Sequence, residues 1–202
     1  MSISTVVFDV GNVLIEWDPR HLYRQFFEDQ EELMEHFLET VCTPAWNLEQ
    51  DRGRTWDEAV AVLVAEYPDC SELIRAYHER WHDMVPGEIS GSPEILTELK
   101  ALGVPLYALT NFSSEKFQEA RRRFPFLETF DGIVVSGEIG LVKPDPAIFH
   151  HLLERYGLDP AVTLFIDDNA ENVAAAESVG IITHHFSGAA KLRTDLKERG
   201  LL

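Results

Sequence analysis

The sequence has 202 residues, of which 45% are hydrophobic and 26% are charged, and its formal net charge at pH 7 is −18. These values are typical of a soluble globular chain with one domain, or with one domain that carries an insertion. The sequence contains no apolar run of 18 residues and no recognisable signal peptide, so we expect a cytoplasmic protein without membrane contact. The negative charge argues against a nucleic-acid partner, because binding to a phosphate backbone requires clustered lysine and arginine.

Five apolar segments are predicted to form strands, and helical patterns separate the later ones. The segments are Thr5–Phe8, Pro105–Leu109, Ile133–Val135, Val162–Ile166 and, more weakly, Ile181–Phe186. One intervening helix is predicted to start at the N-cap Ser92 and to stop at Gly103, and another to run from Asp145 to Gly157. Alternating strands and helices predict right-handed βαβ units, and hence an α/β fold with a Rossmann-like, mostly parallel sheet flanked by helices.

The interval between the first and second predicted strands has a different pattern. It contains four stretches of helical period, HLYRQFF, EELMEHFLETV, TWDEAVAVLVAEY and SELIRAYHERWHDMV, before the Gly- and Pro-rich VPGEISGSP. We therefore predict a Rossmann-like catalytic core formed by residues 1–15 and 87–202, with an inserted all-helical cap formed by residues 16–86. The insertion follows the carboxyl end of the first strand, where open α/β sheets bind their ligands.

Polar residues follow four of the predicted strands and would meet at one edge of a parallel sheet. They are Asp9, the pair Thr110 and Asn111, Lys143, and the pair Asp167 and Asp168. Each of them alone can be explained as a turn or capping residue. Two adjacent carboxylates at a strand end, however, repel each other unless a cation lies beside them. The four groups together therefore predict a charged site that holds a cation.

The four segments FDVGNVL, LTNFS, GLVKPDPAIF and FIDDNAENVAAA resemble the four ordered motifs of the haloacid dehalogenase-like (HAD) superfamily. The helical insertion is similar to the first cap class of that superfamily, the C1 type. The FDVGNV variant most resembles a branch of bacterial phosphatases that includes an α-D-glucose-1-phosphate phosphatase. The resemblance covers essentially the whole chain, and it implies a Mg²⁺-dependent phosphatase of small, sugar-phosphate-like metabolites.

The resemblance also assigns a metal site and a nucleophile. It implies that Asp9 attacks phosphorus and forms an aspartyl-phosphate, which divides one hydrolysis into two easier steps. The implied Mg²⁺ ligands are the Asp9 carboxylate, the Gly11 backbone carbonyl and Asp168, with Asp167 acting through a metal-bound water. Such hard oxygen ligands suit Mg²⁺.

The remaining motif residues are assigned to the substrate. The resemblance implies that the Thr110 hydroxyl and the Asn111 backbone N–H hold phosphate oxygens, and that Lys143 balances the negative charge of Asp9 and the phosphoryl group. We expect Lys143→Ala to slow the reaction with little loss of stability. Trp17 follows the first motif, where core and cap would meet, and is expected to line the substrate pocket. Asn172 is a candidate supporting partner of the aspartate pair.

Position 11 departs from the pattern of many HAD enzymes. They carry a second carboxylate there, which protonates the leaving group and then activates water, whereas this sequence has Gly11. Glycine still supplies the backbone carbonyl for a metal ion. The three residues Glu16, Asp18 and His21 are sequence candidates for the missing proton transfer.

Three other interpretations are open at this point. A 2-haloacid dehalogenase would use Asp9 without metal, but the acidic fourth motif and Thr40, at the place where an arginine is expected, argue against it. A non-catalytic regulatory or binding protein on the same fold is supported by Gly11. The sequence His78-Glu79-x-x-His82 matches a zinc peptidase motif, yet no third ligand follows at the required spacing. The sequence gives no indication of oligomeric state.

Overall fold

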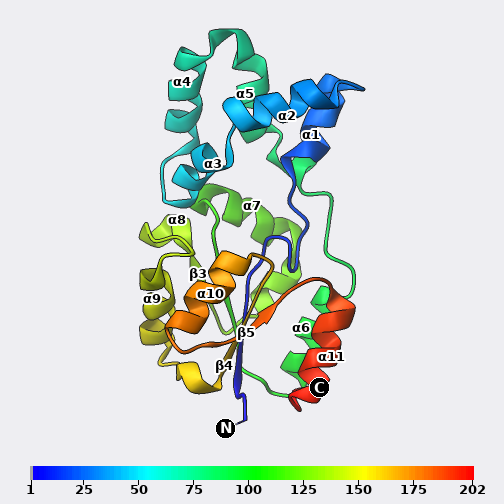
Figure 1. The fold of residues 1–202 in the computed structure, drawn as a ribbon, viewed down its shortest axis with the longest axis vertical. Helices are drawn as coiled ribbons and strands as arrows, with labels where there is room; N and C mark the ends of the chain where they lie inside the picture. The colour runs from blue at the N-terminus through cyan, green and yellow to red at the C-terminus, as the bar shows by residue number, and fades with distance from the viewer. Residues whose placement is uncertain (1) are drawn as a thin grey trace.

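A computed structural model describes residues 2–202, and its centre is a five-stranded, all-parallel sheet (Figure 1). The strand order is β3-β2-β1-β4-β5, so the first strand of the chain lies in the middle. The strands are β1 (Thr5–Phe8), β2 (Leu106–Thr110), β3 (Gly132–Val135), β4 (Thr163–Asp167) and β5 (Ile182–His185). This confirms the predicted α/β fold with a Rossmann-like parallel sheet.

Helices cover both faces of the sheet, because successive side chains of a strand point to opposite faces. In β1, Val6 and Phe8 pack with residues of α6 (Ser92–Ala101) and α11 (Ala189–Glu198), whereas Val7 packs with α9 (Pro146–Tyr156) and α10 (Ala170–Ser178). The other helical elements after β2 are α7 (Ser114–Arg123), α8 (Ser136–Ile139) and the 3₁₀ turns η3 (Pro125–Thr129) and η4 (Pro160–Val162). No helix within residues 2–202 is long and apolar enough to cross a membrane.

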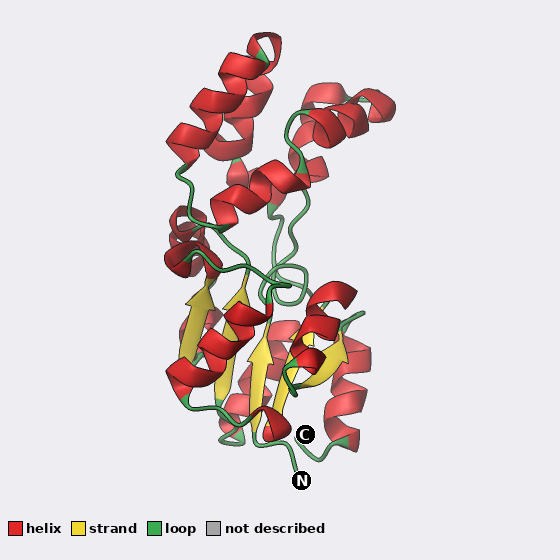
Figure 2. Ribbon diagram, turned by 60° about the vertical axis from the view of Figure 1, so that its left-hand side comes forward, coloured by secondary structure: helices red, strands yellow, loops and turns green. Residues whose placement is uncertain are grey.

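A helical segment lies beyond the carboxyl ends of the strands, toward which the strand arrows point (Figure 2). Its elements are α1 (Pro19–Phe27), α2 (Glu31–Thr40), α3 (Pro44–Asp51), α4 (Trp56–Glu66), η1 (Pro68–Cys70), α5 (Ser71–Glu79) and η2 (Trp81–Met84). Aromatic side chains hold it together, with the Tyr23 and Phe37 ring centroids 4.9 Å apart and Trp56 stacked on Tyr77. The helical character agrees with the predicted cap, while the division at residues 16 and 86 stays a prediction.

The two linkers that connect the helical segment to the sheet are paired with each other. The Glu16 amide donates to the Gly87 carbonyl (3.0 Å), and the Ile89 amide donates to the Leu14 carbonyl (2.9 Å). Ile15 also forms an isolated antiparallel bridge with Glu88. The chain therefore leaves the core and returns to it at the same place.

The predicted start of α6 is wrong by one residue. The capping position is Gly91, which has a left-handed backbone (φ 87°), and Ser92 is the first helical residue with a buried hydroxyl that has no hydrogen-bond partner. Glycine adopts this backbone conformation without the steric cost that serine has. The predicted ends of α9 are confirmed, since the Asp145 side chain accepts from the Ala147 amide and Gly157 ends the helix with φ 63°.

Candidate active site

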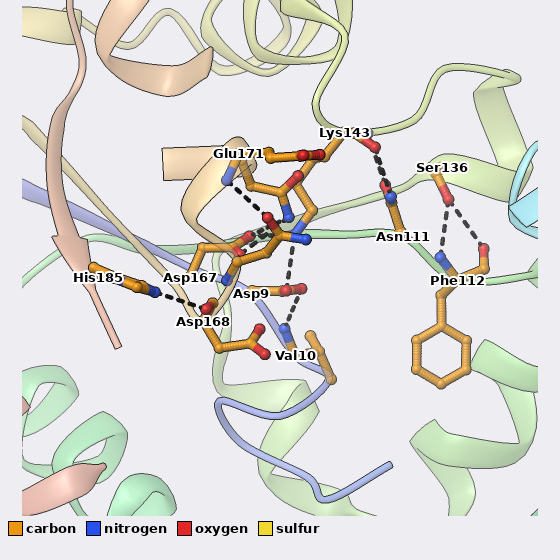
Figure 3. Close-up of polar contacts among 12 residues, drawn as sticks. Asp9, Val10, Asn111, Phe112, Ser136, Lys143, Asp167, Asp168, Glu171 and His185 are labelled. Carbon is orange, nitrogen blue, oxygen red and sulfur yellow. Dashed lines mark hydrogen bonds and ion pairs between the residues drawn. The ribbon is translucent and has the colours of Figure 1, made fainter. Parts of the chain in front are cut away.

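Two of the predicted site residues, Asp9 and Asp167, lie at the same edge of the sheet because their strands are neighbours in register. Phe8 of β1 is paired with Ala108 of β2 on one side and with Ile166 of β4 on the other. Asp9 follows Phe8 directly, and Asp167 ends β4, so their carboxylates lie close together (Figure 3). The adjacency predicted from strand ends is therefore present in the structure.

Lys143 joins these two carboxylates. Its Nζ lies 2.9 Å from Asp9 Oδ2 and 2.7 Å from Asp167 Oδ2. The side chains of Lys143, Asp9 and Asp167 are 1%, 11% and 0% exposed, so the three charges are almost removed from water. Separating a buried ion pair leaves each charge without water and without its partner, which is costly. The three side chains are therefore held in a fixed arrangement.

Asn111 fixes the backbone of Lys143. The Asn111 Nδ2 donates to the Lys143 carbonyl (2.9 Å), and the Lys143 amide donates to Asn111 Oδ1 (2.8 Å). The side chain of Asn111 thus connects the end of β2 to the loop that carries the lysine (Figure 3). Sequence reasoning located Asn111 but assigned only its backbone, since a motif identifies a residue and not which of its atoms makes contacts.

Asp167 is surrounded by donors and Asp168 is less enclosed. The amide of Asn169 donates to Asp167 Oδ1 (2.8 Å), and Asn172 Nδ2 donates to both oxygens (3.0 and 3.1 Å). The contact between Asn172 and the aspartate pair agrees with the sequence expectation. Asp168 is partly exposed, and its backbone carbonyl lies 2.8 Å from His185 Nε2. Asp168 consequently offers the more accessible carboxylate.

Asp9, Asp167 and Asp168 have the geometry of a small metal site. Carboxylate oxygens of all three lie within 4.8 Å of one another. Mg²⁺ binds oxygen ligands octahedrally at about 2.0–2.1 Å, which places opposite ligands roughly 4 Å apart. Lys143 balances only one of the three negative charges. The separation of the oxygens and the remaining charge both fit a divalent cation.

The same environment shifts the protonation equilibria of the site. Burial raises the pKa of Asp9 to about 7; the nearby Lys143 opposes this shift and the charge of Asp167 adds to it. The pKa of Asp168 is also raised, first by burial and then by Asp167. Burial alone would lower the pKa of Lys143, but the charges of Asp9 and Asp167 raise it. The lysine is therefore firmly protonated, while Asp9 and Asp168 take up a proton more readily than free carboxyl groups do.

A cavity of about 240 Å³ opens above this charged cluster, between the core and the helical segment. Trp17 borders it, and its role in substrate binding stays a prediction. The core contributes Asp9, Gly11, Asn12, Asn111, Phe112, Ser113, Lys116, Asp168, Asn169 and Asn172, and the helical segment contributes Trp17, Asn47, Asp51, Trp56 and Trp81. The wall is therefore both aromatic and rich in amide groups, which suits a small ligand with a polar end.

The helical segment is attached to the core beside the cavity. The indole Nε1 of Trp56 donates to Ser113 Oγ (2.9 Å), and the same hydroxyl accepts from the Lys116 amide as the N-cap of α7. The Trp56 amide also donates to Glu115 Oε1 (3.2 Å). One serine thus begins a core helix and holds the cap tryptophan at the cavity.

The sequence candidates for proton transfer lie elsewhere. His21 Nε2 is paired with Glu16 Oε1 (2.7 Å), and Asp18 caps α1 by accepting from the Arg20 amide. None of Glu16, Asp18 and His21 borders the cavity. Glu16 and His21 are engaged with each other, and Asp18 is engaged at the start of α1.

The zinc-peptidase pattern has no structural counterpart. Helix α5 ends at Glu79, so His78 and His82 do not lie one turn apart on one helix. His78 stacks on Trp56, and His82 is 63% exposed. Within residues 2–202, the group of side chains that could hold a metal ion is the cluster of Asp9, Asp167 and Asp168, and no histidine belongs to it.

The fold and the site together are those of an α/β protein with a Rossmann-like sheet, which carries clustered aspartates and a buried lysine at its carboxyl edge. A family model for the haloacid dehalogenase-like hydrolases matches residues 3–180, and the chain belongs to that family. The resemblance seen in the four motifs is confirmed, whereas the glucose-1-phosphate phosphatase branch stays a prediction.

The named relatives include several phosphatases and a dehalogenase. The sesquiterpene phosphatase astK of Aspergillus oryzae is 27% identical over 98% of this chain and 96% of that protein. The (S)-2-haloacid dehalogenase 1 of a Pseudomonas species is 28% identical over 56% of this chain and 47% of that protein. A HAD family enzyme of Bacteroides thetaiotaomicron, solved with magnesium and inorganic phosphate, has a TM-score of 0.69 and 25% identity, covering 92% of this chain and 95% of that chain.

Proposed function

We propose that this hydrolase is a Mg²⁺-dependent phosphatase of small phosphorylated metabolites and works through an aspartyl-phosphate on Asp9. The observation that carries the proposal is the buried cluster of Asp9, Lys143 and Asp167 beneath the cavity, with Asp168 beside it. A phosphatase relative that matches nearly the full chain and a structural neighbour that holds magnesium and phosphate support the same reaction class.

The chain's own residues account for attack on phosphorus. The Asp9 carboxylate attacks the phosphoryl group as the nucleophile, and the Lys143 ammonium, 2.9 Å from Asp9, offsets the negative charge brought in by the substrate. The Thr110 hydroxyl is buried and has no hydrogen-bond partner within the described residues, so it is available to a phosphate oxygen. The Asn111 backbone N–H is assigned to a second phosphate oxygen.

Mg²⁺ would be held by the Asp9 carboxylate, the Gly11 carbonyl and Asp168, with Asp167 acting through a water. When bound, the ion supplies charge neutralisation at the phosphoryl oxygens. The hydrogen bonds from Asn169 and Asn172 fill much of the acceptor capacity of Asp167, which supports an indirect role for that residue.

Dehalogenation is the competing activity, because a haloacid dehalogenase is among the relatives. Two observations favour the phosphatase. The cavity has no arginine among its lining residues to grip a halide, and the exposed Thr40 on α2 donates its hydroxyl to the His36 carbonyl away from the cavity. The acidic pair Asp167 and Asp168 is an arrangement that a metal-free reaction does not need.

A substrate screen tests the proposal. Purified protein is assayed against a panel of metabolite phosphates with Mg²⁺ and with EDTA, and 2-chloropropionate is run in parallel. We expect Mg²⁺-dependent phosphate release, and we expect Asp9→Asn to abolish it while the unfolding temperature is kept. Chloride release without Mg²⁺ would replace the phosphatase with a dehalogenase, and no turnover of any compound would favour the non-catalytic alternative.

A further inference from the structure

The cavity contains a carboxylate that the family motifs do not account for. The carboxylates that border it are Asp9, Asp168 and Asp51. The first two are assigned to the nucleophile and the metal site. Asp51 is the last residue of α3 and comes from the helical segment, 42 residues after the nucleophile in the chain. It therefore reaches the reaction space from outside the sheet.

Asp51 is held firmly in this position. Asn47, one helical turn earlier, donates from Nδ2 to Asp51 Oδ2 (3.2 Å). Just after Asp51 the backbone touches the core: a methyl group on Gly53 would lie 3.1 Å from the Gly137 carbonyl oxygen. A methyl group on Gly137 would in turn lie 2.7 Å from the Ser114 amide. Glycine at position 53 allows the end of α3 to approach the core closely, and glycine at position 137 allows the core segment that it meets to lie against the start of α7.

The surroundings of Asp51 suit both protonation states near neutral pH. Burial raises its pKa to about 7, and the backbone of Ser113 and the charge of Lys143 oppose the shift in part. Protein atoms enclose the carboxyl group on most sides, and it keeps a partial exposure where it borders the cavity. A group whose pKa is close to the working pH can donate a proton in one step and accept one in the next.

We propose that Asp51 is the general acid and base of this active site, in place of the carboxylate that is absent at position 11. The proposal rests on the proposed phosphatase function. It places proton transfer on the helical segment, whereas the nucleophile and the metal ligands belong to the sheet.

The proton balance of the two steps is as follows. In the first step, Asp9 bonds to phosphorus, the bond from phosphorus to the leaving oxygen breaks, and that oxygen takes the proton of Asp51. In the second step, a water oxygen bonds to phosphorus and its proton passes to the Asp51 carboxylate, while the bond from phosphorus to Asp9 breaks. Inorganic phosphate is released, and both aspartates return to their starting states.

Lys116 is the other titratable side chain on the cavity wall without an assigned role. Its ammonium group is engaged by Glu119 Oε1 at 2.8 Å. A protonated lysine has donors and no acceptor, so it has no means of taking a proton from water. Asp51 can perform both halves of the proton transfer.

The test compares leaving groups that differ in their need for a proton. An alkoxide leaves a phosphate ester poorly unless it is protonated, whereas 4-nitrophenolate leaves without a proton. In Asp51→Asn, we expect kcat/KM for an alkyl phosphate substrate to fall by about 10²–10⁴-fold, the usual contribution of a general acid. We expect kcat/KM for 4-nitrophenyl phosphate to change by less than roughly tenfold, because this constant reports steps up to formation of the aspartyl-phosphate.

A second measurement tests Asp51 as the general base in hydrolysis of the aspartyl-phosphate. With 4-nitrophenyl phosphate, Asp51→Asn is expected to release a burst of one 4-nitrophenolate per enzyme and then to turn over slowly, because attack by water on the aspartyl-phosphate lacks its base. The double variant Gly11→Asp, Asp51→Asn places a carboxylate at the position used by other family members, where a side chain meets no atom within 4 Å of its Cβ. We expect it to recover alkyl phosphate activity.

Glu49→Gln is the matched control, since Glu49 lies on the same helix, loses the same charge and is exposed outside the cavity. It is expected to behave like the wild type. If Asp51→Asn lowers kcat/KM equally for both substrates, or leaves both at the wild-type value, Asp51 is not the general acid and base. Either result is compatible with the phosphatase function. A wild-type protein without any phosphatase activity would overturn both proposals.

Discussion

Replacing Lys143 by methionine removes the ammonium group that contacts both Asp9 and Asp167. Methionine fills a similar volume, so the change tests charge and not packing. Loss of one partner from a buried ion pair costs about 3–5 kcal/mol, because the other charge is left without compensation. Asp9 can take up a proton near pH 7, since its pKa is already about 7, so most of the cost falls on the fully buried Asp167. We therefore expect a loss near the lower end, about 3 kcal/mol.

For a chain of this length, that loss corresponds to a fall of roughly 6–12 °C in unfolding temperature. Thermal unfolding followed by circular dichroism in EDTA measures it, and saturating MgCl₂ is expected to narrow the difference from the wild type, because a bound cation offsets the carboxylate charge that has lost its lysine partner. Lys100→Met is the control. Lys100 pairs with Asp131 at 2.6 Å, but both side chains are 40% exposed, so less than about 1 kcal/mol is expected. If Lys143→Met is as stable in EDTA as the control, the reasoning is refuted. The sequence prediction, which expects little loss of stability at Lys143, would then hold.

Asp168→Asn is expected to weaken Mg²⁺ binding at least tenfold, seen as a smaller rise of unfolding temperature on titration with MgCl₂; an unchanged titration would remove Asp168 from the metal site. Asp51→Asn should stabilise the metal-free protein at pH 8 by up to about 4 kcal/mol and much less at pH 4. Burial raises the pKa of Asp51 from 3.8 to about 7 in the folded state, so its penalty grows as pH rises between those values; equal effects at both pH values would contradict this. Ser113→Ala should cost about 1–2 kcal/mol in urea unfolding, because it removes the N-cap of α7 and the acceptor of the Trp56 indole. If only the N-cap hydrogen bond or only the Trp56 hydrogen bond contributes to stability, the loss should be about 1 kcal/mol.

The sheet and its reactive edge were predictable because each parallel strand is a short apolar run that ends in polar residues. All five observed strands begin and end within one residue of their predicted bounds. Once the strand order is that of a Rossmann-like sheet, the ends of β1, β2 and β4 must meet. The proximity of Asp9 and Asp167 follows from that topology alone.

The contacts made by the helical segment were not predictable in the same way. Asp51 ends an amphipathic helix, and its sequence surroundings look like those of any exposed helix end. Its place on the cavity wall depends on the packing of α3 against the core at Gly53 and Gly137, which no motif records. The position of Gly91 as the cap of α6, in place of Ser92, was missed for a related reason: either residue can precede a helix, and the backbone conformation decides.

The paired linkers make the helical segment a module on a single stem. Because residues 14–16 and 87–89 are hydrogen-bonded to each other, the distance between the two ends of the segment is set by the core and not by the helices. Helices can then be added, lost or exchanged between these points without altering the register of the sheet, in the way that domain insertions are tolerated where chain ends lie close together. If the proton-transfer residue sits on this module, a change of cap would alter the chemistry of the site together with its substrate preference.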